Sequence, residues 1–196
     1  MSGRREQRFF LMGVAASLTL GWVGFPYALY ERVEQPFNFS HRTHAGETVA
    51  LGCEDCHAFL ADGRFAGIPR VETCAACHEE VVGESADEKI LVDEYIRPGR
   101  EIPWHVYSKQ PENVEFPHAV HVRLAEIACQ RCHGAHAEAE ELPPVQINRL
   151  TRYSRTIEAG LLPWPNGAGN GGHKMTDCTN CHRDRAVEET CLDCHK

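Results

Sequence analysis

The sequence predicts a mainly irregular chain with short α-helices, preceded by one N-terminal transmembrane helix. Three observations predict this fold class: an apolar run near the start, cysteines confined to one repeated motif, and prolines and glycines scattered through the remainder. The chain has 196 residues, of which 11 are Pro and 16 are Gly. Because Pro and Gly interrupt regular helices and strands, we expect the segments between motifs to be loops.

Residues 1–30 are typical of a membrane anchor. Arg4, Arg5 and Arg8 precede an uncharged stretch that runs from Phe9 to Tyr30. About 20 apolar residues in a helix span the hydrocarbon core of a bilayer, and basic residues before such a helix favour the cytoplasmic side. A cleaved signal peptide would have a shorter apolar region and a small-residue cleavage site. We therefore expect a retained single-pass anchor in the cytoplasmic (inner) membrane, with the rest of the chain outside the cytoplasm.

All ten cysteines belong to five copies of C-x-x-C-H. The cysteines are Cys53, Cys56, Cys74, Cys77, Cys129, Cys132, Cys178, Cys181, Cys191 and Cys194, and the histidines that follow each pair are His57, His78, His133, His182 and His195. This motif is the signature of covalent c-type haem attachment: the thiols form thioethers with haem, and the histidine is the proximal iron ligand. The sequence therefore predicts five covalent haems c.

Three other uses of the cysteines fit less well. A disulfide framework needs no histidine after each pair. A zinc site requires two pairs that converge on one metal, so five pairs would leave one unmatched. A redox dithiol uses a single C-x-x-C. With few residues for each haem, we expect the haems to supply much of the buried apolar surface and the apoprotein to be disordered.

Seven histidines outside the motifs are candidates for the distal iron ligands. They are His41, His44, His105, His118, His121, His136 and His173. Beyond the anchor region the single methionine is Met175, so histidine is the expected second ligand, and bis-histidine ligation gives lower haem potentials than methionine ligation. Five haems need ten histidines and the chain has 12. The two remaining histidines could be structural, or could hold a sixth, non-covalently held haem.

Two phrases of the form F-x-H-x-x-H divide the remainder of the chain into two predicted modules. "FSHRTH" begins at Phe39 and "FPHAVH" begins at Phe116, each shortly before a C-x-x-C-H. We expect one haem module at residues 31–100 with two haems, and a second at 101–196 with three.

The two phrases resemble those of class III cytochromes, which are small bis-histidine multihaem proteins. The resemblance implies that His41 completes the haem on His57 and that His118 completes the haem on His133. His44 and His121 would then serve other haems. Only Lys196 follows His195, so the last haem is expected to take an upstream ligand, with His121 as first candidate and His105 as second.

The charge of the chain bears on its partners. Twenty Lys and Arg stand against 28 Asp and Glu, for a formal net charge of −8. The negative sign argues against nucleic acid as a binding partner. Acidic runs follow two motifs, at 78–88 and 137–141. An acidic surface beside a haem steers a basic redox partner; the alternative is a solvated acidic face without a partner.

The whole layout resembles the multihaem cytochrome c subunits of the menaquinone reductase complex and of the related alternative complex III. The resemblance implies an electron-transfer subunit that is not an enzyme by itself. It further implies molybdopterin-like, iron–sulfur and integral membrane subunits as partners. A periplasmic basic tetrahaem cytochrome would donate electrons, and menaquinone would be reached through the partner subunits.

Three alternatives stay open at this point. They are a subunit of a quinol-oxidising alternative complex III, a stand-alone quinol dehydrogenase, and a multihaem reductase. A reductase needs an open axial position on one haem. Because every motif ends in histidine and distal histidines are in surplus, the sequence disfavours this last reading.

Overall fold

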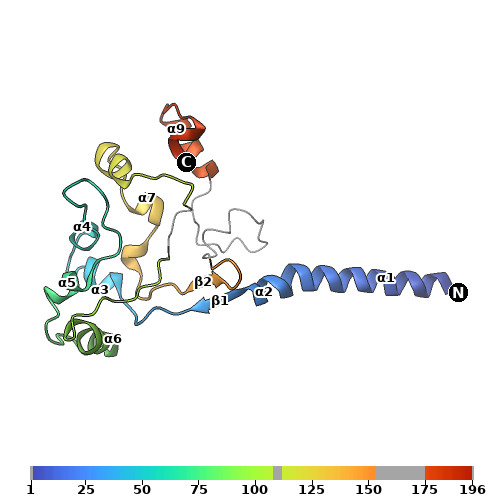
Figure 1. Ribbon diagram of the computed structural model, residues 1–196, viewed down its shortest axis with the longest axis horizontal. Helices are drawn as coiled ribbons and strands as arrows, with labels where there is room; N and C mark the ends of the chain where they lie inside the picture. The colour runs from blue at the N-terminus through green and yellow to red at the C-terminus, as the bar shows by residue number, and fades with distance from the viewer. Residues whose placement is uncertain (1, 108–111, 153–174, 196) are drawn as a thin grey trace.

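The computed structural model describes residues 2–107, 112–152 and 175–195. A long N-terminal helix leads away from a body made of short helices and loops (Figure 1). The helices of the body are α3 His41–Ala45, α4 Cys53–Cys56, α5 Val71–Ala75, α6 Ala86–Ile90, α7 Gln130–His133, α9 Met175–Asp184 and α10 Cys191–Cys194, with π-helical turns η2 Leu91–Ile96 and η3 Val120–Leu124 and the 3₁₀ turn η4 His136–Glu138. This architecture agrees with the short helices and irregular connections expected from the sequence.

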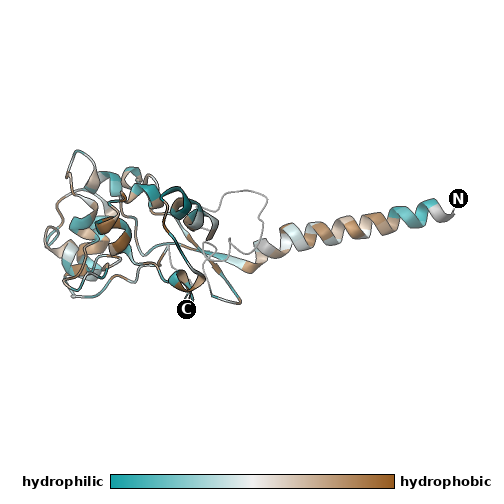
Figure 2. Cartoon of the chain, turned by 90° about the horizontal axis from the view of Figure 1, so that it is seen from above, coloured by the Kyte–Doolittle hydropathy of each residue, from teal (hydrophilic) through white to brown (hydrophobic). Residues whose placement is uncertain are grey.

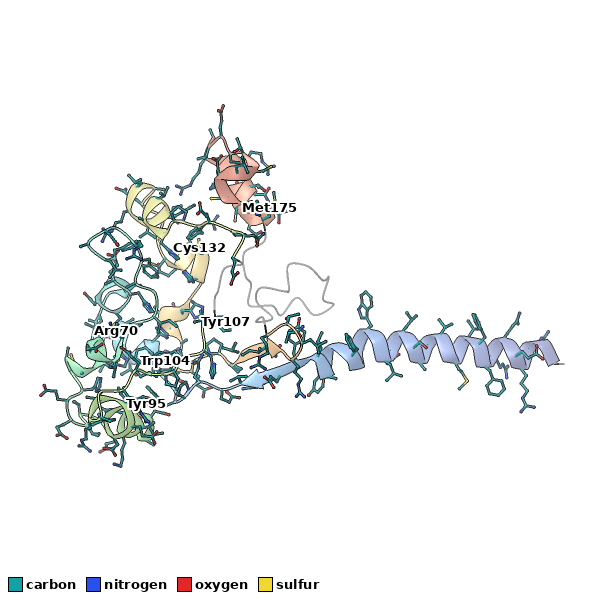
Figure 3. The ribbon with its side chains drawn as sticks, in the orientation of Figure 1. Arg70, Tyr95, Trp104, Tyr107, Cys132 and Met175 are labelled. Atoms are coloured by element: carbon teal, nitrogen blue, oxygen red, sulfur yellow. The ribbon has the colours of Figure 1, made fainter. Side chains whose placement is uncertain are left out.

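The N-terminal helix consists of α1 Ser2–Thr19, the π-helical turn η1 Leu20–Gly24, and α2 Phe25–Leu29. Its stretch Arg4–Leu29 has a mean hydropathy of 1.6 and is, within the described residues, the one helix long and apolar enough to cross a membrane. The helix is mostly apolar, with its hydrophilic residues near the N-terminus (Figure 2). The helix extends away from the body, and its side chains point outward from the helix axis (Figure 3). The helix fits the predicted membrane anchor.

A two-stranded antiparallel sheet joins the end of the anchor to the second half of the chain. Strand β1, Tyr30–Val33, begins directly after α2 and pairs with β2, Val145–Asn148. The register sets Tyr30 opposite Asn148 and Val33 opposite Val145. The Asn148 side chain is buried, and its Oδ1 accepts hydrogen bonds from the backbone N–H groups of residues 150 and 151. This asparagine therefore fixes the turn that ends β2.

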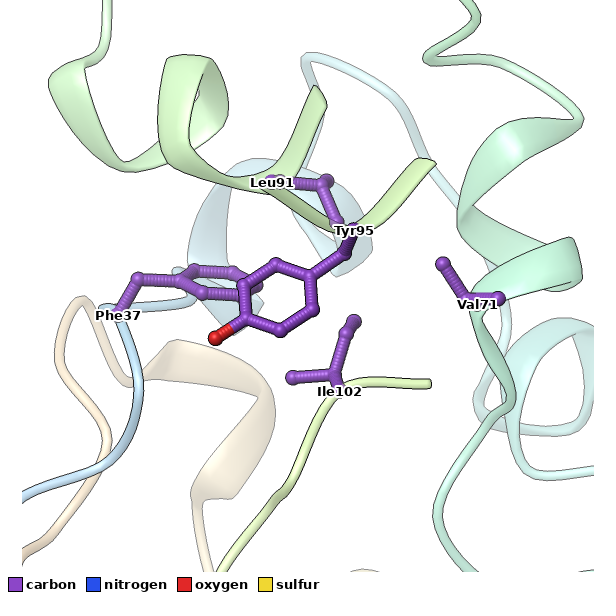
Figure 4. Close-up of a cluster of buried hydrophobic side chains, with 5 residues drawn as sticks. All are labelled: Phe37, Val71, Leu91, Tyr95 and Ile102. Carbon is purple, nitrogen blue, oxygen red and sulfur yellow. The ribbon is translucent and has the colours of Figure 1, made fainter. Parts of the chain in front are cut away.

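The polypeptide core is small and lies around α5, α6 and η2. Phe37, Val71, Leu91, Tyr95 and Ile102 form one buried cluster (Figure 4). The Phe37 ring packs against Tyr95, with ring centroids 5.7 Å apart. In the described part of the chain only two further hydrophobic side chains, Val92 and Val145, are equally buried. A core of this size leaves most of the body without packed apolar side chains of its own.

Hydrogen bonds link the two predicted modules. The Asn38 side chain donates to the Glu140 carbonyl at 2.9 Å and accepts from the Leu142 N–H at 2.9 Å. The Arg42 N–H donates to the Ala139 carbonyl at 3.0 Å. The start of the first module is thus bonded to the middle of the second, and the division at residue 100 stays a prediction.

Candidate functional site

Each C-x-x-C-H motif contains a helical turn. In four motifs the histidine N–H donates to the carbonyl of the first cysteine; the bonds are His57 to Cys53 at 2.8 Å, His78 to Cys74 at 3.0 Å, His133 to Cys129 at 2.9 Å and His195 to Cys191 at 3.0 Å. The fourth motif lies within α9. Residues three apart share one face of a helix, so both thiols of a motif face the same side. We number the motifs, and the haem sites that they would form, 1 to 5 in chain order.

Aspartates support the turn in the first and last motifs. Asp55 Oδ2 accepts the Gly52 N–H at 2.7 Å, and Asp193 Oδ2 accepts the Thr190 N–H at 2.6 Å. Each carboxylate lies in the first turn of its helix, where the helix dipole favours negative charge. The residues between the cysteines therefore help to form the turn that presents the thiols.

Three pairs of imidazole rings face one another, and each pair includes a motif histidine. Ring centroids lie 6.1 Å apart for His44 and His78, 6.4 Å for His118 and His133, and 6.1 Å for His121 and His182. A metal held about 2.0 Å from one nitrogen of each ring would set the centroids roughly 6 Å apart. The spacing therefore fits an iron between the two rings at sites 2, 3 and 4.

The ring nitrogens that face away from these gaps are already engaged. Nδ1 of His44 pairs with the Ser40 carbonyl at 2.8 Å, and Nδ1 of His121 pairs with the Pro117 carbonyl at 3.0 Å. His57 Nδ1 pairs with the Gly67 carbonyl at 2.7 Å. Such partners fix the tautomer and orientation of a metal-binding histidine. In each of these rings Nε2 is the nitrogen left for iron.

On two motif histidines the partner of Nδ1 is a carboxylate and not a backbone carbonyl. His78 Nδ1 pairs with Glu88 Oε1 at 2.7 Å, and His182 Nδ1 pairs with Glu189 Oε2. Hydrogen bonds from the Val82 and Gly83 N–H groups, and from His78, lower the pKa of Glu88, although partial burial opposes them. The sequence analysis missed both carboxylates, since they follow their histidines at different distances along the chain.

The two F-x-H-x-x-H phrases fold alike. Phe39 stacks on His44 with centroids 4.4 Å apart and meets His41 edge-on at 5.0 Å. In the second phrase Phe116 stacks on His121 at 4.2 Å and meets His118 edge-on at 4.9 Å. The spacing that the two phrases share thus has a structural reason: one phenylalanine packs against both histidines. The second histidine of each phrase faces a motif that is not the next one along the chain.

His41 lies close to two other histidines. Its ring centroid is 6.5 Å from that of His136, which also lies outside the motifs. Burial lowers the pKa of His41, and the nearby His57 and His136 rings lower it further. His41 Nδ1 is, among the described residues, the one buried side-chain nitrogen or oxygen without a hydrogen bond. A buried, unpaired imidazole nitrogen beside other imidazoles fits a metal ligand.

The histidines not yet described are His105, His173 and the motif histidine His195. His105 exchanges two hydrogen bonds with Gln35 through its backbone, at 2.9 and 3.0 Å. His195 pairs with Val114 in an isolated β-bridge, and the Cys194 carbonyl accepts the Glu115 N–H at 2.8 Å. The last motif is therefore held against the segment that leads into Phe116. His173 lies outside the described residues.

One expected pairing differs in the structure. His121 was the first candidate for the haem on His195, but its ring faces His182 of site 4 instead. The reason is local: stacking on Phe116 and the bond to the Pro117 carbonyl orient the ring towards α9. By contrast, His118 faces His133, as the class III resemblance implied.

Thiols of different sites lie close enough together to raise one another's pKa. These pairwise effects show which sites are neighbours in space. Burial raises the pKa of the Cys74 thiol and the Cys56 thiol raises it further, which links site 2 to site 1. Cys129 lies in hydrogen-bonding contact with Cys53, which links site 3 to site 1.

The same effect links the later sites. Burial raises the pKa of Cys132, with a further contribution from Cys181 of site 4. Burial likewise raises the pKa of Cys178, with a further contribution from Cys194 of site 5. The sites therefore follow one another in the order 2, 1, 3, 4, 5. Figure 1 agrees, because α4 lies between α5 and α7, with α9 beyond α7.

A cavity of about 590 Å³ adjoins site 1. Apolar side chains that include Leu60, Ile68 and Pro69 line it together with Cys56. This volume falls within the range of roughly 300–1,000 Å³ for ligand pockets. Arg70, Glu72 and Thr73 also line this open cavity, which therefore combines a motif cysteine with both apolar and polar side chains.

No disulfide joins any of the ten cysteines in the part of the chain that the structure describes. Among the described residues no three His, Cys, Asp or Glu side chains converge as a protein metal cage would require. Met175, at the start of α9 (Figure 3), is 64% exposed. The arrangement can hold haems by thioether bonds and by pairs of histidines.

Comparison with known proteins gives one strong match. The chain is 34% identical over 202 residues to the menaquinone reductase multihaem cytochrome c subunit of Nitratidesulfovibrio vulgaris, and the match covers 95% of this chain and 89% of that protein. No protein-family model matches the chain.

Proposed function

Because this chain belongs to the family of multihaem cytochrome c subunits of menaquinone reductase, we propose that it passes electrons from a periplasmic cytochrome towards menaquinone. It acts as an electron-transfer subunit within a membrane complex and is not an enzyme by itself. The name of its relative favours menaquinone reduction over the quinol-oxidising alternative complex III.

The observation that carries this proposal is the row of facing histidine pairs beside free C-x-x-C thiols. A bound haem would supply one-electron oxidation and reduction at iron. The cysteines would fix each macrocycle covalently. The Nδ1 partners hold the imidazoles in one orientation, and the stacked rings of Phe39 and Phe116 shield two of the histidines. At sites 2, 3 and 4 the paired histidines would both bind the iron of a haem, which would favour electron transfer over substrate binding at iron.

We place the anchor in the inner membrane and the haem body in the periplasm. The arginines at the start of α1 favour a cytoplasmic N-terminus, and c-type haem is attached outside the cytoplasm. The partners in this proposal are molybdopterin-like, iron–sulfur and integral membrane subunits. A quinone site would belong to the integral subunits, since a single helix offers little enclosure.

We propose that electrons enter at site 2, which is one end of the row. Exposed acidic side chains follow its histidine, among them Glu79, Glu80 and Glu84. Opposite charges accelerate encounter between redox partners and make it sensitive to salt. A basic tetrahaem cytochrome is the donor that this end would favour, and site 5 is the end from which electrons would leave.

The proposal counts five covalent haems, with His41 and His136 as the pair for a sixth, non-covalent haem. The class III resemblance instead assigns His41 to the haem of site 1. A pyridine haemochrome count against protein mass, before and after acid–acetone extraction, separates the two assignments. Five haems with none extractable would leave His41 to site 1.

The function is tested on the complex purified from membranes under mild detergent. We expect the chain to co-purify with larger subunits, and its haems to be reduced by a reduced basic tetrahaem cytochrome and reoxidised by a menaquinone analogue. Raising ionic strength should slow the first step and leave the second unchanged. Isolation of the chain without partners, or reduction by the donor that does not depend on salt, would contradict the proposal.

A further inference from the structure

Haem sites 2 and 4 are equivalent in construction. In each, the second histidine of an F-x-H-x-x-H phrase faces the motif histidine, His44 facing His78 and His121 facing His182, with ring centroids 6.1 Å apart in both. In each, the phrase histidine is held by a backbone carbonyl, while the motif histidine is held by a carboxylate. The structure thus repeats one arrangement at two places far apart in sequence.

Site 1 differs at the corresponding position. Its motif histidine, His57, is held by the Gly67 carbonyl at 2.7 Å. A carbonyl is a neutral acceptor, whereas a carboxylate carries a full negative charge, and hydrogen bonds to charged groups are the stronger class. The proximal ligand at site 1 is therefore in a neutral setting, and those at sites 2 and 4 are in an anionic one.

Both carboxylates are partly buried, so their charge can influence the histidines that they contact. The side chain of Glu88 is 11% exposed and that of Glu189 is 25% exposed, so solvent screens them incompletely. Glu88 also accepts the Val82 and Gly83 N–H groups, each at 2.8 Å, which fix its position. A hydrogen bond from a ligating histidine to a carboxylate makes that ligand more basic.

We propose that Glu88 and Glu189 are positioning residues that lower the reduction potentials of the haems at sites 2 and 4 relative to that at site 1. A more basic imidazole donates more electron density and stabilises ferric over ferrous iron. Second-shell hydrogen bonding is one of the levers by which a protein sets haem potential. This inference rests on the proposed haem ligation, and it adds a function for two residues outside every motif.

The test replaces each carboxylate by its neutral isostere in the full chain within its complex. Glu88→Gln and Glu189→Gln should each raise the potential of one one-electron component and leave the others in place. We expect a change of about tenfold in the ferric-to-ferrous equilibrium of that haem, which corresponds to about 59 mV for one electron. Spectropotentiometry of the haem absorbance measures the shift, and the low-spin ferric EPR spectrum shows one altered signal.

Neighbouring carboxylates provide matched controls. Glu79→Gln removes the same charge from the residue next to His78, and Glu188→Gln removes it from the residue next to Glu189; both side chains are exposed. We expect these controls to shift the potentials by a smaller amount spread over several components. Equal shifts in Glu88→Gln and Glu79→Gln, and in Glu189→Gln and Glu188→Gln, would overturn the proposal, because the effect would then be general charge and not the hydrogen bond.

Haem content separates this inference from the proposed function. The variants should keep the haem-to-protein ratio and the low-spin spectrum of the unaltered protein, which report ligation. If Glu88→Gln loses haem because its backbone contacts fail, Glu189→Gln tests the inference at site 4. An unaltered protein whose haems are not bis-histidine ligated would contradict the ligation scheme itself, whichever potentials the variants show.

Discussion

Individual histidines in this chain are oriented by their neighbours before any iron is considered. In the second phrase the Phe116 ring lies against His121 and the Pro117 carbonyl pairs with its Nδ1. Both contacts come from residues no more than five positions before the histidine, so the ring direction is encoded locally. The partner that the ring meets, His182, is supplied by a distant part of the chain.

Replacing His121 by alanine should leave one haem with a single protein ligand. His121→Ala removes the ring that faces His182 at 6.1 Å, and the open axial position would bind small ligands. We expect one haem equivalent to become high-spin and, when reduced, to bind carbon monoxide, as seen in EPR and difference absorbance spectra.

A nearby substitution provides the control for His121→Ala. Arg123 is exposed and lies over the Phe59 ring at 4.2 Å. Arg123→Ala should leave all haems low-spin. Carbon monoxide binding by the unaltered protein, or no change of spin state in His121→Ala, would count against the pairing of His121 with His182.

At the scale of elements, α5 depends on a residue that follows it by a long stretch of chain. Glu101 accepts the Val71 N–H at 3.2 Å and the Arg70 Nε–H at 2.8 Å, and so satisfies an otherwise unpaired donor at the start of α5. Val71 belongs to the buried cluster and Cys74 packs against that cluster. The contact therefore couples the small core to haem site 2.

The Glu101 contact predicts a pH-dependent contribution to stability. The Val71 N–H first, and then Arg70, hold the pKa of Glu101 below its ordinary value of 4.5. A depressed carboxyl pKa stabilises the fold above the ordinary value, and this stabilisation disappears as the pH falls through the lower folded value. Glu101→Gln should therefore lower Tm at pH 7, with the difference from the unaltered protein vanishing in acid.

Thermal melting followed by circular dichroism across pH tests the prediction for Glu101. Glu72→Gln is the matched control, since Glu72 lies 3.4 Å from Arg70 and is 70% exposed. We expect its melting curve to follow the unaltered protein at each pH. A Tm difference in Glu101→Gln that persists at low pH would mean that the contact acts through something other than its charge.

The sequence predicted much at this scale. The uncharged run from Phe9 predicted the long apolar helix, and the assignment of the motifs as haem attachment sites stays a prediction. The pairing of His44 with His78 and of His121 with His182 was not predictable, because it depends on which loops fold back together. The pairing of Glu88 and Glu189 with motif histidines could not be predicted either, because the two residues lie in helix α6 and in the α9–α10 connection and share no motif.

At the scale of the whole molecule, few side chains bury apolar surface. Seven hydrophobic side chains are buried in the described part of the chain, while a domain of ordinary size relies on a large core. The haems would supply the missing interior. A chain expressed without haem attachment should therefore lack a cooperative thermal transition and be digested rapidly beyond the anchor.

This last prediction can be measured with a variant in which all ten cysteines are replaced by serine. Limited proteolysis and near-ultraviolet circular dichroism would compare it with the haem-loaded protein in detergent. The membrane helix should persist, because its backbone hydrogen bonds are satisfied within the helix. A compact, protease-resistant body in the variant would show that the polypeptide folds without its cofactors.

The junction between anchor and body has a mechanical consequence. Helix α2 ends at Leu29, β1 begins at Tyr30, and the Leu29 carbonyl accepts the Arg149 N–H at 2.8 Å. A flexible linker lets a tethered domain sweep a volume that grows with linker length. No such linker separates the helix from the sheet, so the body cannot swing freely on its anchor. With the helix in a bilayer, the body would be held at the membrane surface, and mobile redox partners would have to come to it.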